Sequence, residues 1–443
     1  MINAVEVSVV LILFAFLLLL GYYVHSVLLA SGVIGLVLLD GFPVLSGLLG
    51  NEPFNSTANY SLTTIPMFVL MAQFVLQSGL VQDMFYTVYR MSRGKNSLLG
   101  TLTIIVGGFL GAVSGSGTAT AASLGQVAVP ELRKRGFKPA LAGAVAAAGG
   151  SLSSIIPPSI ILILYGVATE TPIGDLFVSA VIPGILVTMV FIAVMYFLYF
   201  RHLRKERETA SALEQEVEEA EVEAPPVKRL ILANSVGAII VAVIFGGIYS
   251  GFVTPTEAGA VGAVAAFVAA LILGKVNMTF LRNSLGETLK VTSMVMLILI
   301  GAQVFGRFVS LSLLPRQLIN LFEPIMDSPK LVLFILLLVF FVLFMFIEGA
   351  AVILMTMPVL LPVIQAIQVD ILWFGTFVAV IGTLGLLTPP VGLSVYATSA
   401  SSGIPPGPIF KYAMIFALAA AVVVGGLMIF FPEIALWLPG TME

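Results

Sequence analysis

Long runs of apolar residues, separated by short polar or charged stretches, repeat along most of this chain. A run of roughly 20 apolar residues is what an α-helix needs to cross a membrane core about 30 Å thick. Such runs predict membrane-spanning segments at 5–24, 26–49, 62–80, 140–168, 176–200, 230–249, 256–274, 291–309, 371–398 and 409–438. Two further apolar stretches, 98–132 and 331–367, carry small or polar residues at their centres.

Composition agrees with a polytopic helical membrane protein. Apolar residues make up 59% of the chain and charged residues only 10%, whereas a soluble domain carries roughly 25% charged residues. The chain has no Cys, only two His without a partner at metal-ligand spacing, and no glycine-rich phosphate-binding motif. These absences exclude a disulfide framework, an HExxH-type metalloprotease and an ATPase within the chain itself.

The segment 201–229 is the one stretch of soluble character. It begins with Arg and Lys, continues with a run of Glu and ends with Pro225-Pro226 and two basic residues. This composition is typical of a helical or disordered linker, which divides the chain into membrane halves at 1–200 and 230–443. The basic residues of this linker, of 90–95 and of 133–138 predict that these parts are cytoplasmic. The acidic connections 50–61 and 169–175 and both chain termini are then predicted outside.

The stretch 98–132 has basic residues beyond both ends, so it is not expected to cross the membrane once. Its two apolar parts, 98–113 and 118–131, are about 24 Å and about 21 Å long as helices, which is too short to span the membrane. Between them lies Ser114-Gly115-Ser116-Gly117, which favours a turn. The sequence therefore predicts a re-entrant helical hairpin whose tip is buried in protein or lines a cavity.

The two halves of the chain repeat each other at an offset of 232 positions. At this offset Pro130 matches Pro362, and the pair Pro157-Pro158 matches Pro389-Pro390. Three small residues also match, because Gly117 falls on Gly349, Gly150 on Gly382 and Ser151 on Thr383. Counting the crossings places the second hairpin, 331–367, in the opposite orientation. Paired hairpins and paired Pro-broken helices in inverted orientation are typical of secondary transporters with a site near the membrane midplane.

The Pro-Pro pairs predict broken helices near 140–168 and 371–398. Each pair removes two backbone donors and disfavours helix at the preceding residue. The freed carbonyls, with the hydroxyls of 151–159 and 383–388, suit a hard monovalent cation, and the following half-helix directs N–H groups at an anion. The alternative is a pair of proline kinks with small-residue packing. The duplication after two hairpins favours the functional interpretation.

The two hairpin tips differ in polarity. Ser114–Thr118 is rich in hydroxyls, although its glycines and serines also permit close helix packing. The second tip contains Glu348, and an intramembrane carboxylate is a functional candidate by default. Glu348 alternatively caps the hairpin or pairs with Arg307. Gln73 and Gln303 are expected to form interhelical hydrogen bonds rather than to bind ligands.

Four stretches resemble a known family. They are 111–125 (GAVSGSGTATAASLG), 157–166 (PPSIILILYG), 249–258 (YSGFVTPTEA) and 388–392 (TPPVG), with Pro183-Gly184 and 373–375 adding to them. Together they make nearly the whole chain similar to the large membrane subunit of the tripartite ATP-independent periplasmic (TRAP) transporters. The linker is longer and more acidic than the family pattern.

The resemblance implies an all-α, elevator-type transporter of the inner membrane, with two hairpins and two broken helices moving against a scaffold. It implies sodium as the coupling ion, a small four-helix membrane subunit, a periplasmic substrate-binding protein and a carboxylate or sulfonate as substrate. The implied substrate-binding residues are Ser114, Gly115, Ser116, Gly117, Thr118, Ser159, Glu348, Gly349 and Ala350. The implied sodium-binding residues are Ser114, Ser116, Ser151, Ser153, Ser154, Pro157, Gly349, Gly382, Thr383, Gly385, Thr388 and Pro389.

Two other functions stay open at this point. A dicarboxylate/sodium symporter of similar repeat architecture works without a binding protein, and composition does not separate it from a TRAP subunit. A membrane-embedded enzyme or assembly scaffold is the third possibility, against which stand the missing Cys, the sparse His and the absence of paired intramembrane acids. No enzymatic activity, no cofactor other than sodium and no nucleic-acid partner are expected.

Overall fold

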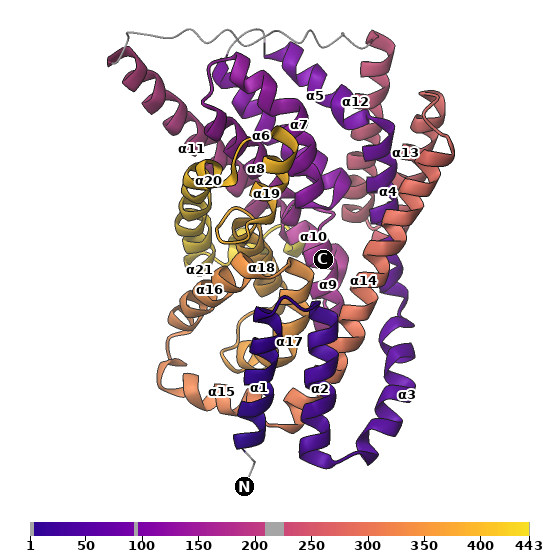
Figure 1. Cartoon of the computed structure of the whole chain (residues 1–443), viewed down its shortest axis with the longest axis vertical. Coiled ribbons are helices and arrows are strands. Elements are labelled where there is room, and N and C mark those ends of the chain that lie inside the picture. Colours follow the sequence, from indigo (N-terminus) through magenta and orange to yellow (C-terminus); the bar gives the residue numbers. More distant parts are fainter. Residues whose placement is uncertain (1–3, 93–95, 209–225, 443) are drawn as a thin grey trace.

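The computed structural model describes residues 4–92, 96–208 and 226–442, and throughout these ranges the regular structure is helical (Figure 1). Eight of the described helices are long and apolar enough to cross a membrane. The first half contains α1 (Ala4–Leu19), α2 (Val24–Asp40), α3 (Pro43–Thr57), α4 (Thr64–Ser78), α5 (Leu80–Met91), α6 (Asn96–Ser114), α7 (Gly117–Lys134), α8 (Pro139–Ser151), α9 (Ile160–Thr169), α10 (Ile173–Ser179) and α11 (Val181–Glu208). The all-helical fold class predicted from the sequence is confirmed.

The second half begins after the charged segment, of which residues 209–225 lie outside the described residues. It contains α12 (Val227–Val241), α13 (Pro255–Ile272), α14 (Met278–Leu311), α15 (Leu314–Phe322), α16 (Pro329–Phe346), α17 (Gly349–Ala366), α18 (Ile371–Gly385), α19 (Leu393–Ser402), α20 (Pro406–Ala420), α21 (Gly426–Phe430) and α22 (Glu433–Leu436).

The internal repeat is visible in the helix boundaries. Helices α7 and α17 both have 18 residues, and both their first and their last residues differ by 232 positions. The ends of α6 and α16 and the starts of α8 and α18 follow the same offset. In each copy a helical hairpin (α6–α7, α16–α17) precedes a broken helix (α8–α9, α18–α19). The sequence repeat therefore corresponds to a repeat of structure.

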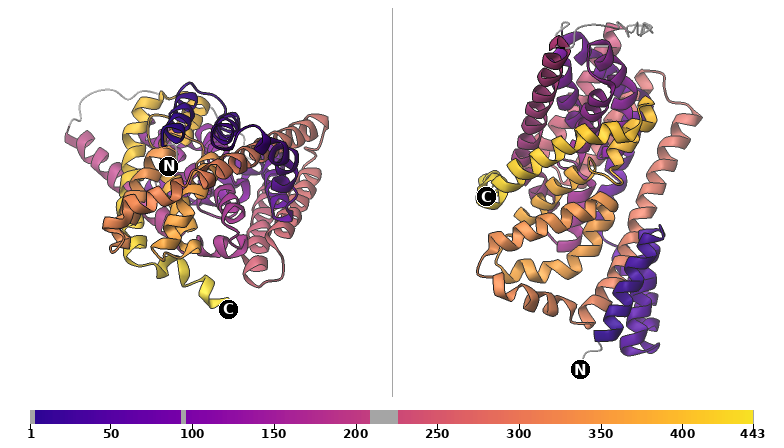
Figure 2. Two further views of the ribbon diagram at one scale, coloured as in Figure 1. Left: turned by 90° about the horizontal axis from the view of Figure 1, so that it is seen from below. Right: turned by 60° about the vertical axis from the view of Figure 1, so that its left-hand side comes forward.

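The longest described helix, α14, has 34 residues and is about 51 Å long. Beside its first turns lies α4, where the rings of Phe74 and Phe280 stack at 5.5 Å. Beside its second half lies α2, because a Cβ on Gly32 would come within 2.8 Å of the Phe305 backbone nitrogen. Figure 2 shows α14 running along one side of the molecule down to α1–α3. Helix α14 thus contacts α4 with its first turns and α2 with its second half.

Three predictions about local structure are wrong. The segment 26–49 is not one helix, because α2 ends before Gly41 (φ 76°) and α3 starts at Pro43. Helix α3 then continues to Thr57, through most of the expected connection 50–61. Helix α14 contains the predicted span 291–309, and it extends this span at its start to Met278. Neither Gln73 nor Gln303 forms a side-chain hydrogen bond within the described part of the chain.

Glycine allows α6 to pack directly against α8 and the turn that follows it, Leu152–Ser154. A Cβ on Gly107 would lie 2.5 Å from the Cα of Gly149, and one on Gly111 would lie 2.7 Å from the Cα of Ser153. Real Cβ atoms do not approach backbone this closely, so the two helices can pack at this distance only with glycine at both positions. This contact fixes the first hairpin on the first broken helix.

We expect Gly107→Ala to destabilise the folded protein by about 1–3 kcal/mol, because α6 and α8 must separate to admit the methyl group. Gly286→Ala in α14 is the matched control, since nothing lies within 4 Å of its Cβ position. Alanine is the better helix former by about 1 kcal/mol, so the control should keep or raise stability. Thermal unfolding of the purified protein measures both changes, and equal midpoints in the two variants would contradict the direct α6–α8 contact.

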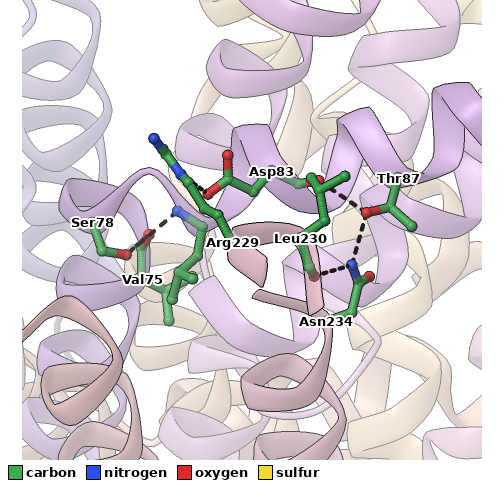
Figure 3. A network of polar contacts seen from close by, with 8 residues as sticks. Val75, Ser78, Asp83, Thr87, Arg229, Leu230 and Asn234 are labelled. Carbon is green, nitrogen blue, oxygen red and sulfur yellow. Dashed lines mark hydrogen bonds and ion pairs between the residues drawn. The ribbon is translucent and has the colours of Figure 1, made fainter. Parts of the chain in front are cut away.

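A polar network joins the two halves of the chain beside the turn between α4 and α5 (Figure 3). Arg229 Nε donates to Asp83 Oδ2 at 2.6 Å, and Asn234 Nδ2 donates to Thr87 Oγ1 at 2.7 Å. The Arg229 guanidinium also covers Gly79 (φ 80°), whose Cβ position lies 3.3 Å from Nη2. Asp83 is only 2% exposed, so removing Arg229 would leave a buried carboxylate without an ion-pair partner. The network holds α12 against α5.

Asp83→Ala should destabilise the protein by about 2–3 kcal/mol, because it leaves a half-buried guanidinium without its counter-charge. The matched control is Glu287→Ala, which removes an ion pair to Lys290 whose side chains are 49% and 75% exposed. An exposed pair of this kind contributes about 0–1 kcal/mol. Unfolding in denaturant distinguishes the two, and a loss in Asp83→Ala no larger than in the control would refute a structural role for this ion pair.

Candidate functional site

The first hairpin tip is a two-residue turn between α6 and α7. Gly115 has φ 60°, a conformation that glycine adopts without strain, and Ser116 is extended. The Ser116 hydroxyl accepts a hydrogen bond from Ala119 N at 3.4 Å and so caps α7. The Ser114 hydroxyl lies 2.6 Å from Thr120 Oγ1. Hydroxyl groups therefore take the place of missing backbone partners at the tip.

The first broken helix consists of α8, a single 3₁₀ turn at Leu152–Ser154, the Pro157-Pro158 pair and α9. The Ser153 hydroxyl donates to the Gly150 carbonyl at 2.9 Å. Ser159 caps α9 by accepting from Leu162 N at 3.4 Å, and its hydroxyl donates to the Ser154 carbonyl at 2.6 Å. The serines of this segment thus hold the backbone that the prolines leave without helical partners.

The hairpin tip lies directly on this break. A Cβ on Gly117 would lie 3.2 Å from Ser153 Oγ and 3.5 Å from the Gly150 carbonyl oxygen. A Cβ on Gly115 would lie 3.3 Å from the Pro158 carbonyl oxygen. Hydroxyl and carbonyl oxygens of the break therefore lie directly opposite the glycines of the tip.

The second hairpin and break meet in the corresponding way. Val391 N donates to the Met345 carbonyl at 3.3 Å, and a Cβ on Gly385 would lie 2.7 Å from the Phe344 carbonyl oxygen. Glu348 caps α17, since its Oε2 accepts from Ala350 N at 3.0 Å. Of the alternatives open for Glu348, the structure shows the cap. No ion pair between Glu348 and Arg307 occurs among the described residues.

Both hairpin tips and both breaks border one cavity of about 100 Å³, which has space for only a few water molecules. Its walls come from Gly115, Ser116, Gly117, Thr118, Ser154, Ser159, Ile160, Ile161, Phe344, Ile347, Glu348, Gly349, Gly382, Leu386 and Leu393. This cavity is called the tip cavity below. It brings together residues that are more than 200 positions apart in the sequence.

Several candidate residues lie outside the lining of the tip cavity. They are Ser114, Ser151, Ser153, Pro157, Ala350, Thr383, Gly385, Thr388 and Pro389. The hydroxyls of Ser151 and Thr383 donate to carbonyls of their own helices, those of Ala148 at 2.9 Å and Ala379 at 3.0 Å. Both hydroxyls keep lone pairs with which to accept a bond or bind a cation.

Four helices of at least ten residues begin at the tip cavity. The first residues of all four line it: these helices are α7, α9, α17 and α19. The first N–H groups of a helix have no intrahelical partner, and each N-terminus carries a partial positive charge of about +0.5 e. The lining contains no Lys or Arg and a single carboxylate, that of Glu348. The cavity is therefore suited to an anion together with a small cation.

Sequence reasoning missed the apolar part of this wall and the contact between the repeats. Ile161 touches the second tip and the second break, because Cβ positions on Gly349 and Gly382 lie 2.7 and 3.0 Å from its Cδ1. Thr398 Oγ1 of α19 donates to the Ala121 carbonyl of α7 at 3.2 Å. An apolar residue in a membrane protein carries no signal that separates a cavity wall from a lipid-facing position. The proximity of Ile161 to the first Pro-Pro pair was the only available signal.

Comparison with known proteins is consistent along nearly the whole chain. The family model described as the DctM component of the tripartite ATP-independent periplasmic transporter matches residues 11–434. The chain is 30% identical over 396 residues to the C4-dicarboxylate TRAP transporter large permease protein DctM of Pseudomonas aeruginosa, covering 87% of each chain. It is 30% identical over 382 residues to the sialic acid TRAP transporter large permease protein SiaM of Vibrio cholerae, covering 86% of each.

A solved structure supports the fold. The crystal structure of the Alcanivorax borkumensis YdaH transporter resembles this chain with a TM-score of 0.65 and 17% identity, covering 93% of this chain and 98% of that one. The relatives are named as transporter permeases rather than as enzymes. The family match and the extent of both permease alignments show that this chain belongs to the DctM component family of the tripartite ATP-independent periplasmic transporters.

Proposed function

We propose that this protein is the large subunit of a sodium-coupled importer of a small organic anion in the inner membrane of a bacterium or archaeon. The observation that carries this proposal is the tip cavity, where two hairpin tips and four helix N-termini from both repeats meet. A membrane protein gains nothing in stability from interrupting helices in its interior. Such interruptions are functional in secondary transporters because they supply backbone groups to ligands.

Sodium is the coupling ion in this proposal. Among the described residues there is no group of three or more His, Cys, Asp or Glu that could hold a metal. The oxygen atoms near the first break are hydroxyls and carbonyls, such as those of Ser153 and Gly150 opposite the first tip. Neutral oxygens of this kind suit a monovalent hard cation better than a divalent or transition metal, which prefers carboxylates, imidazoles or thiolates.

Charge balance explains why anion and cation would move together. An organic anion beside Glu348 adds negative charge to a site whose only positive contribution comes from helix N-termini. Sodium bound between a hairpin tip and its break lowers the free-energy cost of burying this negative charge. Each ion therefore improves the affinity for the other, which is the thermodynamic basis of coupled transport.

The substrate class and the partners follow from the family. The relatives are named for C4-dicarboxylate and for sialic acid, which share a carboxylate group. We infer an organic acid as substrate, a small four-helix membrane subunit and a periplasmic binding protein that delivers the substrate. The charged segment 201–229 would lie in the cytoplasm and both chain termini outside, as the basic residues indicate.

Transport needs a second conformation of the tip cavity. With space for only a few waters, the cavity must open before an organic acid can enter or leave it. We infer an elevator-type movement, in which the hairpins and broken helices travel as one body against a scaffold that includes α4, α13 and α14. The direct packing of each hairpin on its break, as at Gly111 and Ser153, favours joint movement over separate hinges.

Uptake by proteoliposomes tests the proposed function. The chain is reconstituted with the neighbouring small subunit and binding protein, and carboxylate uptake is compared with and without an inward sodium gradient. Uptake that requires both sodium and the binding protein is the expected result. Sodium-driven uptake without the binding protein would instead identify a binding-protein-independent symporter, and sodium-independent uptake would contradict the coupling.

Ser153→Ala should raise the sodium concentration needed for half-maximal uptake by about tenfold, which corresponds to the loss of one ligand of about 1.4 kcal/mol. Ser78→Ala is the matched control. Both serines are buried, and both hydroxyls donate to a carbonyl three residues earlier at 2.9 Å. Only Ser153 lies opposite the hairpin tip. An identical sodium dependence in the two variants would place the cation elsewhere.

A further inference from the structure

A second, larger cavity lies further along the helices that border the tip cavity. It has a volume of about 890 Å³, within the range of roughly 300–1,000 Å³ that is usual for small-molecule sites. Its walls come from α3, α14, α17 and the last turns of α9. Along α17, Leu354 in this cavity is about 7 Å from Gly349 in the tip cavity, and along α9, Val167 is about 9 Å from Ile161. The two cavities are neighbours on the same pair of helices.

One face of α14 supplies polar groups to this larger cavity, which is called the Arg307 cavity below. Gln303, Arg307 and Ser310 follow one another at helical spacing and are all exposed to it. The opposite wall contributes Asn51 and Asn55 from α3. Amide and guanidinium groups thus face one another across a space large enough for an organic acid, and all of them can donate hydrogen bonds.

Arg307 has no partner within the described residues. Its guanidinium forms no ion pair and no hydrogen bond there, although it lies in a helix that is apolar enough to span a membrane. A basic residue near a helix end often hydrogen-bonds the last carbonyls of its own helix, but Arg307 does not. The neighbouring Gly306 packs against Pro358 of α17, with its Cβ position 3.3 Å from Pro358 Cβ. An exposed guanidinium without a counter-charge, at the wall of a cavity, is placed to bind an anion.

Two carboxylates also line the Arg307 cavity. Glu52 accepts a hydrogen bond from the Ser56 hydroxyl at 3.5 Å, and Glu170 terminates α9 in a left-handed conformation. Neither forms an ion pair with Arg307. Arg307 is the only positively charged side chain in the lining, so an anion bound here must orient its charged end toward α14.

We propose that the Arg307 cavity is a carboxylate-binding site, in which Arg307 binds the charged group of an organic acid before the acid reaches the tip cavity. This inference rests on the proposed function and adds to it an entry site at a charged residue of α14. Arginine recognises carboxylates in bidentate geometry, and the amides of Asn51, Asn55 and Gln303 are placed to bind the polar remainder of the acid.

The absence of Cys from the chain permits a direct test. Ser310→Cys is introduced into the full chain, reconstituted with its small subunit, and its reaction rates with an anionic and a cationic methanethiosulfonate are compared. Adding Arg307→Gln should lower the ratio of anionic to cationic rate by about five- to tenfold, as expected when one unit charge is removed about one helical turn away. Arg316→Gln, in exposed α15 and outside the cavity lining, is the matched control and should leave the ratio unchanged.

Arg307→Lys keeps the charge and should keep the ratio within about twofold, which separates loss of charge from misfolding. A ratio that does not respond to Arg307→Gln, or that falls equally in Arg316→Gln, would overturn the proposal.

Protection from labelling identifies the ligand. Succinate, sialic acid and a simple monocarboxylate are each added to the Ser310→Cys protein, with succinamide as the uncharged counterpart. We expect at least one carboxylate, and not succinamide, to slow labelling when Arg307 is present and to lose this effect in Arg307→Gln. Protection by phosphatidylglycerol alone would assign the site to a lipid headgroup, and protection by none of the carboxylates would refute the proposed ligand class. Labelling does not require transport, so these results stand apart from any failure of sodium-driven uptake.

Discussion

Backbone that leaves regular helix in the interior of a membrane protein must find its hydrogen-bond partners within the protein, and the centre of this fold depends on that requirement. Each hairpin tip covers a broken helix, as Gly117 covers Ser153 and as Phe344 covers Gly385. Side chains at these glycines would separate the two surfaces and expose the interrupted backbone. Small residues at the tips and breaks are thus a condition for having helix ends inside the protein at all.

The helix ends give this protein a way to attract an anion without a fixed positive charge. Four N-termini around the tip cavity each contribute a partial charge of about +0.5 e, which attracts a carboxylate without strongly repelling sodium nearby. A guanidinium in the same place would compete with sodium for the bound carboxylate. In our proposal the full charge of Arg307 instead lies in the Arg307 cavity, which an anion reaches before it meets sodium.

Much of this arrangement could be predicted from the sequence, because its signals are local. Ser114–Gly117 lies between two segments too short to span a membrane, and each Pro-Pro pair marks the start of a broken segment. The length of α14 was missed because residues 278–290 include Arg282, Glu287 and Lys290, which interrupt the apolar pattern without interrupting the helix. The cavity walls were missed because Ile161 and Leu386 resemble any apolar residue of a membrane helix.

The repeat sets the backbone of the site, while the side chains distinguish its halves. Helices α7 and α17 start at matching positions, yet a serine hydroxyl caps the first and the Glu348 carboxylate caps the second. The break at Ser151–Ser159 has several hydroxyls where its counterpart is mostly apolar. Symmetric backbone therefore brings equivalent N–H groups to one cavity from two directions, and asymmetric side chains place neutral oxygens on one side and a carboxylate on the other. In our proposal, a site built in this way binds an anion and sodium next to each other, which is what their coupled transport requires.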